Sequence, residues 1–221
     1  MVDVIITPEF QNACRLGLVE IGDVNIEPSG KELSDQIEEF RRRRMKFFGE
    51  KKVADVPGVV DARTMFRKLG VNPNKVRPCS EVFLRHLLRG EAPPKVSNLV
   101  DLCNYCSAEA ATPVCAYDIE SVSPPMELRP GRQDENFEAI RRGIIEVEGR
   151  PILADADGPF GGPFVDSART MITENTRQAL LVWYAPVNYD GGALIADLRT
   201  LADRLELHSI GQVNAFRCIP E

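Results

Sequence analysis

Histidines, long apolar runs and positive charge are all scarce in this 221-residue sequence. Its two histidines and single Cys-x-x-Cys provide no motif that would complete a four-ligand zinc site. The longest apolar run, ALLVWYA at 179–185, has the length of a strand and falls far short of a membrane span. Acidic residues outnumber basic ones by 33 to 27, which argues against nucleic-acid binding through bulk charge. Any contact with RNA must therefore use a local patch.

The first ten residues, MVDVIITPEF, contain an early acid and no basic stretch, so we expect no signal peptide. Six cysteines without a secretory signal are typical of a reducing compartment, and we expect a cytoplasmic protein. Hydrophobic residues make up 43% of the chain, which is enough to bury a core without disulfide bonds.

Alternating helical and extended patterns predict an α+β fold, a single domain with layered helices and a mixed β-sheet. Residues 1–70 are expected to form an N-terminal layer of strands and helix on a core made by 71–221. Apolar spacing predicts helices at 31–48, 58–69, 79–90 and 96–110, and a C-terminal helix with a stripe of Leu194, Leu198, Leu201 and Leu205. Strands are expected at 2–7, 16–26, 114–118, 143–149, 151–155, 178–187 and 212–219, and a Gly/Pro-rich loop at 155–167.

The stretch DLCNYC places Cys103 and Cys106 on the predicted 96–110 helix, on the same face as Val96. Free cysteine is among the most buried residue types, so core packing is the favoured interpretation. A redox dithiol is typical of a helix N-terminus, whereas this pair lies in mid-helix. We expect neither metal nor cofactor, with a metal site and a redox pair as the alternatives. Asn104, at the edge of this face, either offers its amide to a neighbouring cleft or bonds a nearby loop.

A family resemblance runs in order over about 55–185. The segment KVSNLVDLCNYCSAEAATPVCAYD, 95–118, resembles the Asn-Val-Val-Asp-x-Thr-Asn-Tyr-Val…Gly-x-Pro-x-His-Ala-x-Asp segment of the B3/B4 editing domain of phenylalanyl-tRNA synthetase β-subunits. RPCSEVFLRHLLRG, 77–90, is similar to the Arg-Pro-Ser-Ser-Glu signature of free-standing B3/B4 proteins. LADADG…VDSARTMITENT resembles their Asp-x-x-Gly…Asp-Ser…Thr-x-x-Thr segment.

The resemblance implies a deacylase that acts in trans, hydrolysing the ester that joins a wrong amino acid to the 3′ end of a tRNA. It implies tRNA as partner, and neither DNA nor a membrane. An aminoacyl ester is already activated, so the site mainly has to position water and hold the amino acid and ribose. A scavenging hydrolase needs no ATP site, and no glycine-rich phosphate loop is present in the sequence. Two other functions stay open: an amino-acid-binding protein without hydrolysis, and an RNA-binding accessory module.

Carrying the synthetase motif over residue by residue identifies a candidate pocket. Its Thr-Asn pair falls on Cys103 and Asn104, its histidine on Cys115, and its Gly-Gly turn on Asp166 and Ser167. In the synthetase these positions help the editing pocket to select tyrosine, so the changes argue against hydrolysis of tyrosyl-tRNA by this protein. The catalytic positions implied by the resemblance are Asn104, Asp166 and Ser167, and the substrate-binding ones are Arg77, Ser80, Glu81, Cys103, Tyr105 and Cys115.

A carboxylate at Asp166 would suit an arginine-like side chain, because carboxylates bind guanidinium groups with paired hydrogen bonds. Free-standing members of this family are associated with removal of canavanine, an arginine mimic, from tRNA. The alternative for Asp166 is a turn-forming role in its loop. The signature residues Arg77, Ser80 and Glu81 also have a structural alternative. They could cap the predicted 79–90 helix, with Ser80 near its N-terminus and Arg77 paired with Glu81.

The run RRRRMK, which contains Arg41, Arg42, Arg43 and Arg44, offers a candidate contact for tRNA phosphates. Its alternative is a solvated helix face.

Overall fold

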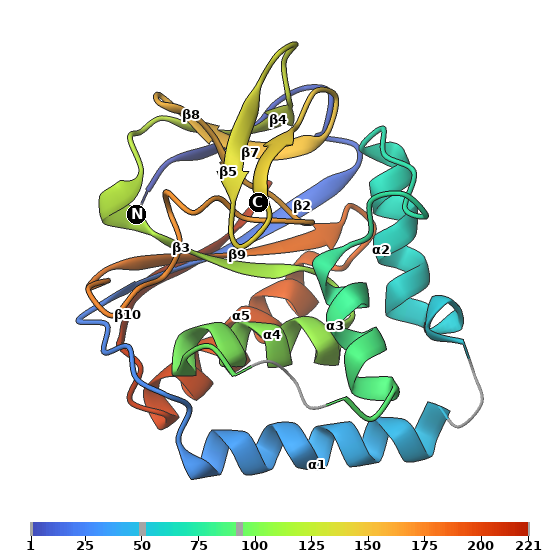
Figure 1. Ribbon diagram of the computed structural model, residues 1–221, viewed down its shortest axis with the longest axis vertical. Helices are drawn as coiled ribbons and strands as arrows, with labels where there is room; N and C mark the ends of the chain where they lie inside the picture. The colour runs from blue at the N-terminus through green and yellow to red at the C-terminus, as the bar shows by residue number, and fades with distance from the viewer. Residues whose placement is uncertain (1, 49–51, 92–94, 221) are drawn as a thin grey trace.

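Helices and sheets occupy separate layers in the computed structural model, which describes residues 2–48, 52–91 and 95–220 (Figure 1). This arrangement confirms the predicted α+β class. The helices are α1 (Lys31–Phe48), α2 (Pro57–Lys68), α3 (Cys79–Leu88), α4 (Asn98–Ala110) and α5 (Gly191–Leu207), with short 3-10 helices η1 (Val53–Asp55) and η2 (Ile119–Ser121).

The larger sheet has the antiparallel order β10-β2-β9-β3, so β3 lies at its edge. Its strands are β2 (Cys14–Gly22), β3 (Val114–Asp118), β9 (Ala179–Pro186) and β10 (Gln212–Ile219). Every residue of β9 is buried because both faces of the sheet are covered. Leu181 and Trp183 pack among the helices, whereas the alternate residues Leu180 and Val182 pack against the second sheet. Two covered faces explain why ALLVWYA is apolar without a break.

The second sheet has the order β1-β4-β7-β8 and packs on the larger one. Its strands are β1 (Val4–Ile6), β4 (Met126–Pro130), β7 (Pro151–Asp155) and β8 (Gly158–Gly161). Since β1 pairs with β4 in parallel and the other pairs are antiparallel, this sheet is mixed, as predicted. A separate hairpin is formed by β5 (Asn136–Ala139) and β6 (Gly143–Glu146). Figure 1 shows its tip descending in front of the larger sheet.

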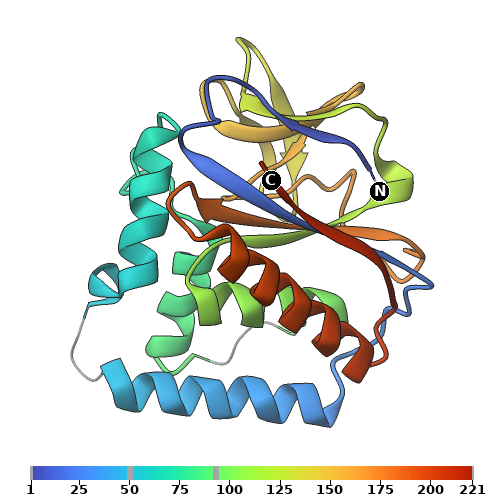
Figure 2. The same cartoon turned by 180° about the vertical axis from the view of Figure 1, so that it is seen from behind.

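Helices α4 and α5 cover the other face of the larger sheet, and α1 crosses beneath them (Figure 2). The predicted leucine stripe of α5 is confirmed: its four leucines are at most 1% exposed. On α4, Cys103 and Cys106 are buried in the same core, which confirms the packing expected of them. Among the described helices, none has the length and apolar composition required to span a membrane.

Two details differ from the sequence prediction. The segment 155–167 was expected to be a loop, but it contains β8, and β4 and β5 were also missed. Because β8 is an edge strand, it tolerates the glycines and the proline that made the segment resemble a loop. Val96 was placed on the buried face of the fourth helix, yet it is 50% exposed, because α4 begins only at Asn98.

The first seventy residues do not lie to one side of the larger sheet. Strand β2 is hydrogen-bonded to β10 on one side and to β9 on the other, over most of its length. Its alternate side chains enter both cores: Val19 faces the helices, and Leu18 faces the second sheet. The N-terminal segment is therefore an integral part of the framework that positions β3.

Candidate functional site

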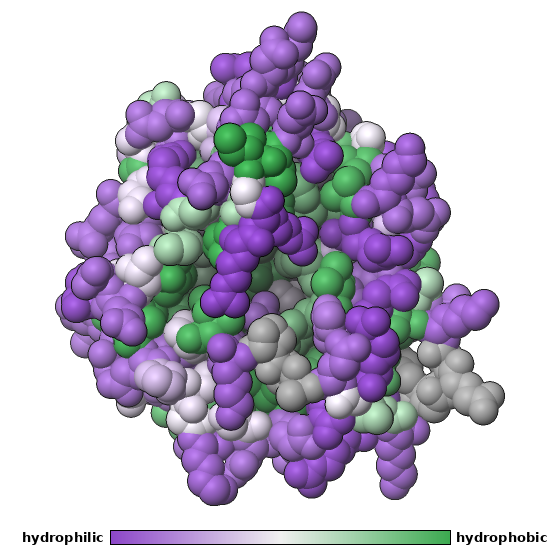
Figure 3. Space-filling model, in the orientation of Figure 1, coloured by the Kyte–Doolittle hydropathy of each residue, from purple (hydrophilic) through white to green (hydrophobic). Residues whose placement is uncertain are grey.

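Two cavities share Asn104, on α4, in their walls. Cavity A, of about 670 Å³, lies between α4, β3, the start of the β5–β6 turn and residues 166–174. Cavity B, of about 800 Å³, lies between α3, the segment before it and the far side of the hairpin. The face in Figure 3 is hollowed near its centre, where hydrophobic side chains gather and hydrophilic ones cross the rim.

Asn104 is half-buried on α4 at the boundary between the cavities. Cys103, the residue before it, is 3% exposed and lines cavity A from the core side. Within the described residues, the Asn104 side-chain amide has no hydrogen-bond partner, so the predicted alternative of a bond to a nearby loop is not observed. The amide thus has two donors and an acceptor for a ligand in either cavity.

Asp166 reaches cavity A from the opposite wall. Its Oδ1 accepts a hydrogen bond of 2.7 Å from the Tyr117 hydroxyl, which itself lies 3.2 Å from the Tyr184 hydroxyl. Burial raises the pKa of the Asp166 carboxyl from 3.8 to about 6, although the Tyr117 hydrogen bond opposes that rise. Gly161 makes this close approach possible, since a Cβ there would lie 2.6 Å from the Tyr117 ring and 2.9 Å from Asp166 Oδ1.

Backbone pairing with β5 fixes the segment that carries Asp166 and Ser167. The Ile140 amide donates to the Asp166 carbonyl at 3.1 Å, and the Ala168 amide donates to the Glu138 carbonyl at 2.8 Å. Ser167 is 3% exposed, and its hydroxyl accepts from the Arg169 amide at 3.1 Å. Ser167 therefore shapes the turn, and the structure does not place it in the wall of either cavity among the described residues.

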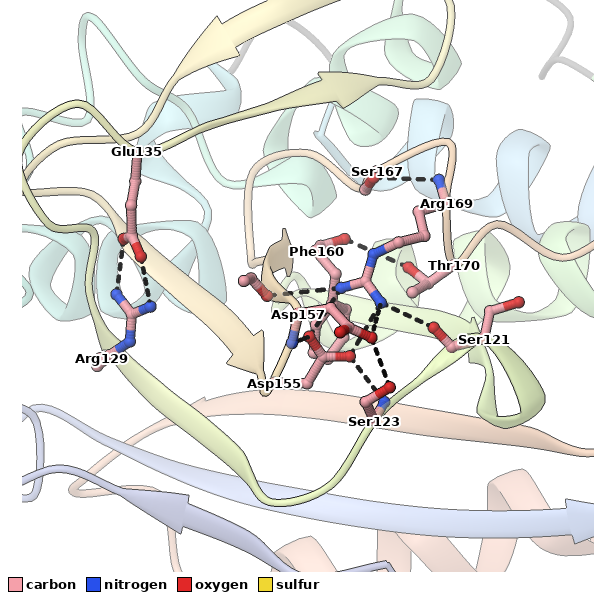
Figure 4. A network of polar contacts seen from close by, with 11 residues as sticks. Ser121, Ser123, Arg129, Glu135, Asp155, Asp157, Phe160, Ser167, Arg169 and Thr170 are labelled. Carbon is pink, nitrogen blue, oxygen red and sulfur yellow. Dashed lines mark hydrogen bonds and ion pairs between the residues drawn. The ribbon is translucent and has the colours of Figure 1, made fainter.

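The Arg169 side chain anchors the other end of the same segment (Figure 4). Its guanidinium group contacts both carboxylate oxygens of Asp155, at 2.9 and 3.0 Å, and donates to the Ser121 carbonyl at 2.9 Å. It also lies 5.6 Å from the centre of the Phe160 ring. These contacts tie β7 and η2 to the loop, so Asp166 projects from a rigid base.

The cysteine thiols near cavity A are protonated. Cys115 is 5% exposed, and its thiol donates to the Gly162 carbonyl at 3.6 Å. The neighbouring Cys79 thiol and burial raise the pKa of Cys115 well above its ordinary range. Burial likewise raises the pKa of Cys103. Because the thiolate is the nucleophilic form, this environment disfavours attack by either sulfur.

Three predicted substrate-binding residues lie elsewhere in the described structure. Tyr105 packs edge-on against Phe40 at 5.3 Å between ring centres and lies beneath Arg204, between α1 and α5. Ser80 is buried and donates to the Ala111 carbonyl at 3.2 Å, so it joins α3 to the end of α4. The structural alternative for Ser80, a place at the N-terminal cap of α3, is not observed either, because Pro78 occupies the cap position.

Glu81, the third of these residues, is fully buried. Its two carboxylate oxygens accept from Arg63 at 2.9 and 3.0 Å, and Arg85 approaches at 2.9 Å. The predicted pair with Arg77 is present but long, at 3.9 Å. Glu81 therefore joins α2 and α3, whereas Arg77 is 45% exposed and lines cavity B.

The arginine run on α1 is occupied by contacts within the protein. Arg41 and Arg42 pair with Glu38 at 2.6 and 3.2 Å, and Arg43 pairs with Glu39 at 3.6 Å. Arg44 donates to the Glu109 carbonyl at 2.8 Å and stacks over Phe40. Such i,i+3 and i,i+4 pairs are typical of a solvated helix face.

Several residues around the cavities were not identified from the sequence. Glu138 and Arg141 of the hairpin, and Glu174 of the following loop, line cavity A. Arg142 and Arg150 line cavity B. Because β5 was not predicted, these charges could not be placed beside Asn104 from the sequence alone. In the described ranges 2–48, 52–91 and 95–220, no three His, Cys, Asp or Glu side chains are grouped as a metal site would require.

Comparison with known proteins gives one family. The B3/4 domain model matches residues 61–190, which is more than half of the chain. The β-subunit of phenylalanine–tRNA ligase from Rhodopirellula baltica is 27% identical over 135 residues, covering 59% of this chain and 18% of that protein. The corresponding subunit from Xylella fastidiosa strain 9a5c is 26% identical over 151 residues, covering 61% and 19%.

An N-terminal fragment of the phenylalanyl-tRNA synthetase β-subunit from Pyrococcus horikoshii aligns with all of this chain and 55% of its own, at 11% identity and a TM-score of 0.49. The chain spans about a fifth of the length of the bacterial β-subunits it matches. From the family model, this chain belongs to the B3/4 domain family.

Proposed function

We propose that this protein hydrolyses the ester of mischarged aminoacyl-tRNA in trans, with the aminoacyl group in cavity A. The observation that carries this proposal is the amide of Asn104, which lies in the wall that the two cavities share and has no hydrogen-bond partner in the part of the chain that the structure describes. A ligand with two unlike parts, an amino acid and a nucleotide, suits two cavities that meet at one polar group. The linking ester would then lie beside Asn104.

In the proposed reaction, a water molecule attacks the ester carbonyl carbon. The bond from that carbon to the ribose oxygen breaks, one proton of the water passes to the ribose oxygen, the other is released to solvent, and the amino acid leaves with a free carboxylate. Asn104 holds the carbonyl or the α-amino group, and its N–H donors stabilise negative charge developing on the carbonyl oxygen. A positioned water suits this site, because the thiols of Cys103 and Cys115 are neutral.

Asp166 is the proposed reader of the amino-acid side chain. Its carboxylate is held by Tyr117 in a cavity whose wall also includes the apolar residues Val100, Met171 and Ile172. Glu138 and Glu174 add two further carboxyl groups to the same wall. This combination favours a side chain with an apolar stem and a cationic end, such as a guanidinium group.

A second candidate function is binding of an amino acid or an aminoacyl analogue without hydrolysis. It is favoured by the composition of cavity A, whose described wall contains no imidazole to act as a base. Both functions use the same cavity, so only a chemical assay separates them.

The deciding experiment incubates the purified protein with a panel of mischarged tRNAs and follows the loss of the ester. We expect turnover of at least one member, most readily one with a cationic side chain. Asn104→Ala should slow hydrolysis of every ester in the panel, because Asn104 acts on the part common to all. Binding of a free amino acid in calorimetry, with no ester lost from any tRNA, would decide for the second function.

A further inference from the structure

Cavity B is lined by several cations, although the chain as a whole is acidic. The chain carries a net charge of −6, yet Lys75, Arg77, Arg142 and Arg150 all line this cavity. Its wall, as described, includes no aspartate or glutamate. Lys75, Arg142 and Arg150 make no ion pair with any residue in the described ranges. Cations gathered in a concave surface raise the local concentration of an anionic ligand.

The floor of cavity B is apolar and aromatic. Phe83, Phe164 and Ile145 line it, and the Arg150 guanidinium lies 5.7 Å from the centre of the Phe164 ring. Aromatic floors with cationic rims bind single-stranded nucleic acid, because bases stack on the rings while the phosphates meet the cations. His86 also lines the cavity, and its ring contacts the Glu91 carboxylate.

The hairpin tip connects the two cavities. Arg141 lines cavity A, and the next residue, Arg142, lines cavity B. Arg141 has a φ of 57°, in the left-handed region that costs a residue with a Cβ roughly 1 kcal/mol or more. This turn sends consecutive arginines into different cavities.

We infer that cavity B binds the unpaired 3′ strand of the tRNA, with its phosphates on Arg142, Arg150, Lys75 and Arg77. The inference rests on the proposed function for the identity of the RNA, and it assigns RNA binding to cavity B instead of the arginine run on α1. A strand that ends at Asn104 would place its terminal ester at the mouth of cavity A. The four cations of α1 are engaged with Glu38, Glu39, the Glu109 carbonyl and Phe40, and α1 crosses the far side of α4.

The test measures the affinity of uncharged tRNA for three variants across a salt series. In Arg142→Gln/Arg150→Gln, we expect binding about tenfold weaker at 0.15 M salt, as for lost charged hydrogen bonds. The slope of log affinity against log salt should fall by about 1.4, since each single-strand phosphate contact contributes about 0.7. Arg42→Gln/Arg43→Gln removes two ion-paired arginines and should change neither value appreciably. Arg199→Gln, at an exposed position on α5 that lines neither cavity, is the control for overall charge.

A second arm uses tRNA from which the unpaired 3′ nucleotides have been removed. The wild-type protein should bind the trimmed tRNA more weakly than intact tRNA. The Arg142→Gln/Arg150→Gln variant should bind the trimmed tRNA with the same affinity as the wild-type protein, because the contacts it lacks are no longer made. Arg142→Gln alone, at an exposed position, provides the same comparison if the double variant does not fold. Equal deficits with trimmed and intact tRNA would overturn the assignment to the 3′ strand. So would a loss of affinity confined to the α1 variant. Uncharged tRNA contains no ester, so these results stand apart from the hydrolysis assay.

Discussion

The ionisation of Asp166 gives the sharpest prediction for side-chain selection. Burial raises its pKa to about 6, so the carboxyl is about nine-tenths ionised at pH 7 and about one-tenth at pH 5. If the ionised form binds a cationic side chain, the ratio of kcat/KM for a cationic over a neutral aminoacyl-tRNA should rise about tenfold from pH 5 to pH 7. Taking the ratio cancels the intrinsic pH dependence of ester hydrolysis, which both substrates share.

Asp166→Asn should lower this ratio roughly 10- to 150-fold, as expected for a lost charged hydrogen bond of about 1.5–3 kcal/mol, and should make it independent of pH. The amide oxygen can still accept from Tyr117, so the change is confined to charge. Tyr117→Phe is the matched control. It removes a hydrogen bond that lowers the Asp166 pKa, so the midpoint of the pH profile should move upward. A flat ratio in wild type, or an equal loss on both substrates in Asp166→Asn, would refute the role of Asp166 as side-chain reader.

Stability provides an independent measure of the same ionisation. The folded-state pKa of Asp166 is raised, so the protonated form stabilises the fold below about pH 4, and that contribution is lost as pH rises through about 6. At pH 8 the buried charge therefore destabilises the native state. Asp166→Asn should raise the melting temperature at pH 8 by several degrees, for a gain of about 1–3 kcal/mol, and should raise it less at pH 4.

Three further predictions concern residues whose roles the structure separates. Glu81→Gln should lower the free energy of unfolding by about 3 kcal/mol in urea denaturation, because it leaves the Arg63 guanidinium in a buried site without its anion; an unchanged midpoint would return Glu81 to a substrate-binding role. Cys115→Ser should keep most deacylase activity, since a neutral thiol is no nucleophile. A covalent acyl-enzyme trapped on Cys115 by acid quench and mass spectrometry would contradict this. Prolonged treatment with EDTA should leave both the melting temperature and ester hydrolysis unchanged, whereas stoichiometric zinc in elemental analysis, lost together with the fold, would point to a structural metal.

Strong local patterns were sufficient to predict most of the helices and the larger sheet. Helix α1 has the predicted bounds, and the leucine stripe of α5 is buried as expected. Strand β9 is covered on both faces, so its apolar run is continuous and identifies it without reference to any partner. The missed strands β4, β5 and β8 are only four or five residues long. Strand β4 pairs with β1 more than a hundred residues before it, whereas β5 and β8 pair with strands that are their neighbours in the sequence.

The candidate site was predictable only in part. Motif resemblance placed Cys103, Asn104, Cys115 and Asp166, and all four line cavity A. The same motif also suggested Tyr105, which is adjacent to Asn104 in sequence but points about 100° around the helix, into the packing between α1 and α5. Sequence adjacency on a helix therefore gave no guide to which side chain would face the cavity.

Which basic residues are available to bind phosphate could not be predicted from their spacing in the sequence. The densest basic run, on α1, lies among glutamates three and four residues away, and helical geometry pairs these charges with one another. The cations of cavity B are dispersed between Lys75 and Arg150, and only the fold of the β5–β6 hairpin over α3 brings them together. The clustered arginines of α1 are neutralised within their own helix, whereas Lys75, Arg142 and Arg150 have no ion-pair partner among the described residues. An unpaired cation in a concave wall is the better candidate for a phosphate ligand, even in a chain whose net charge is −6.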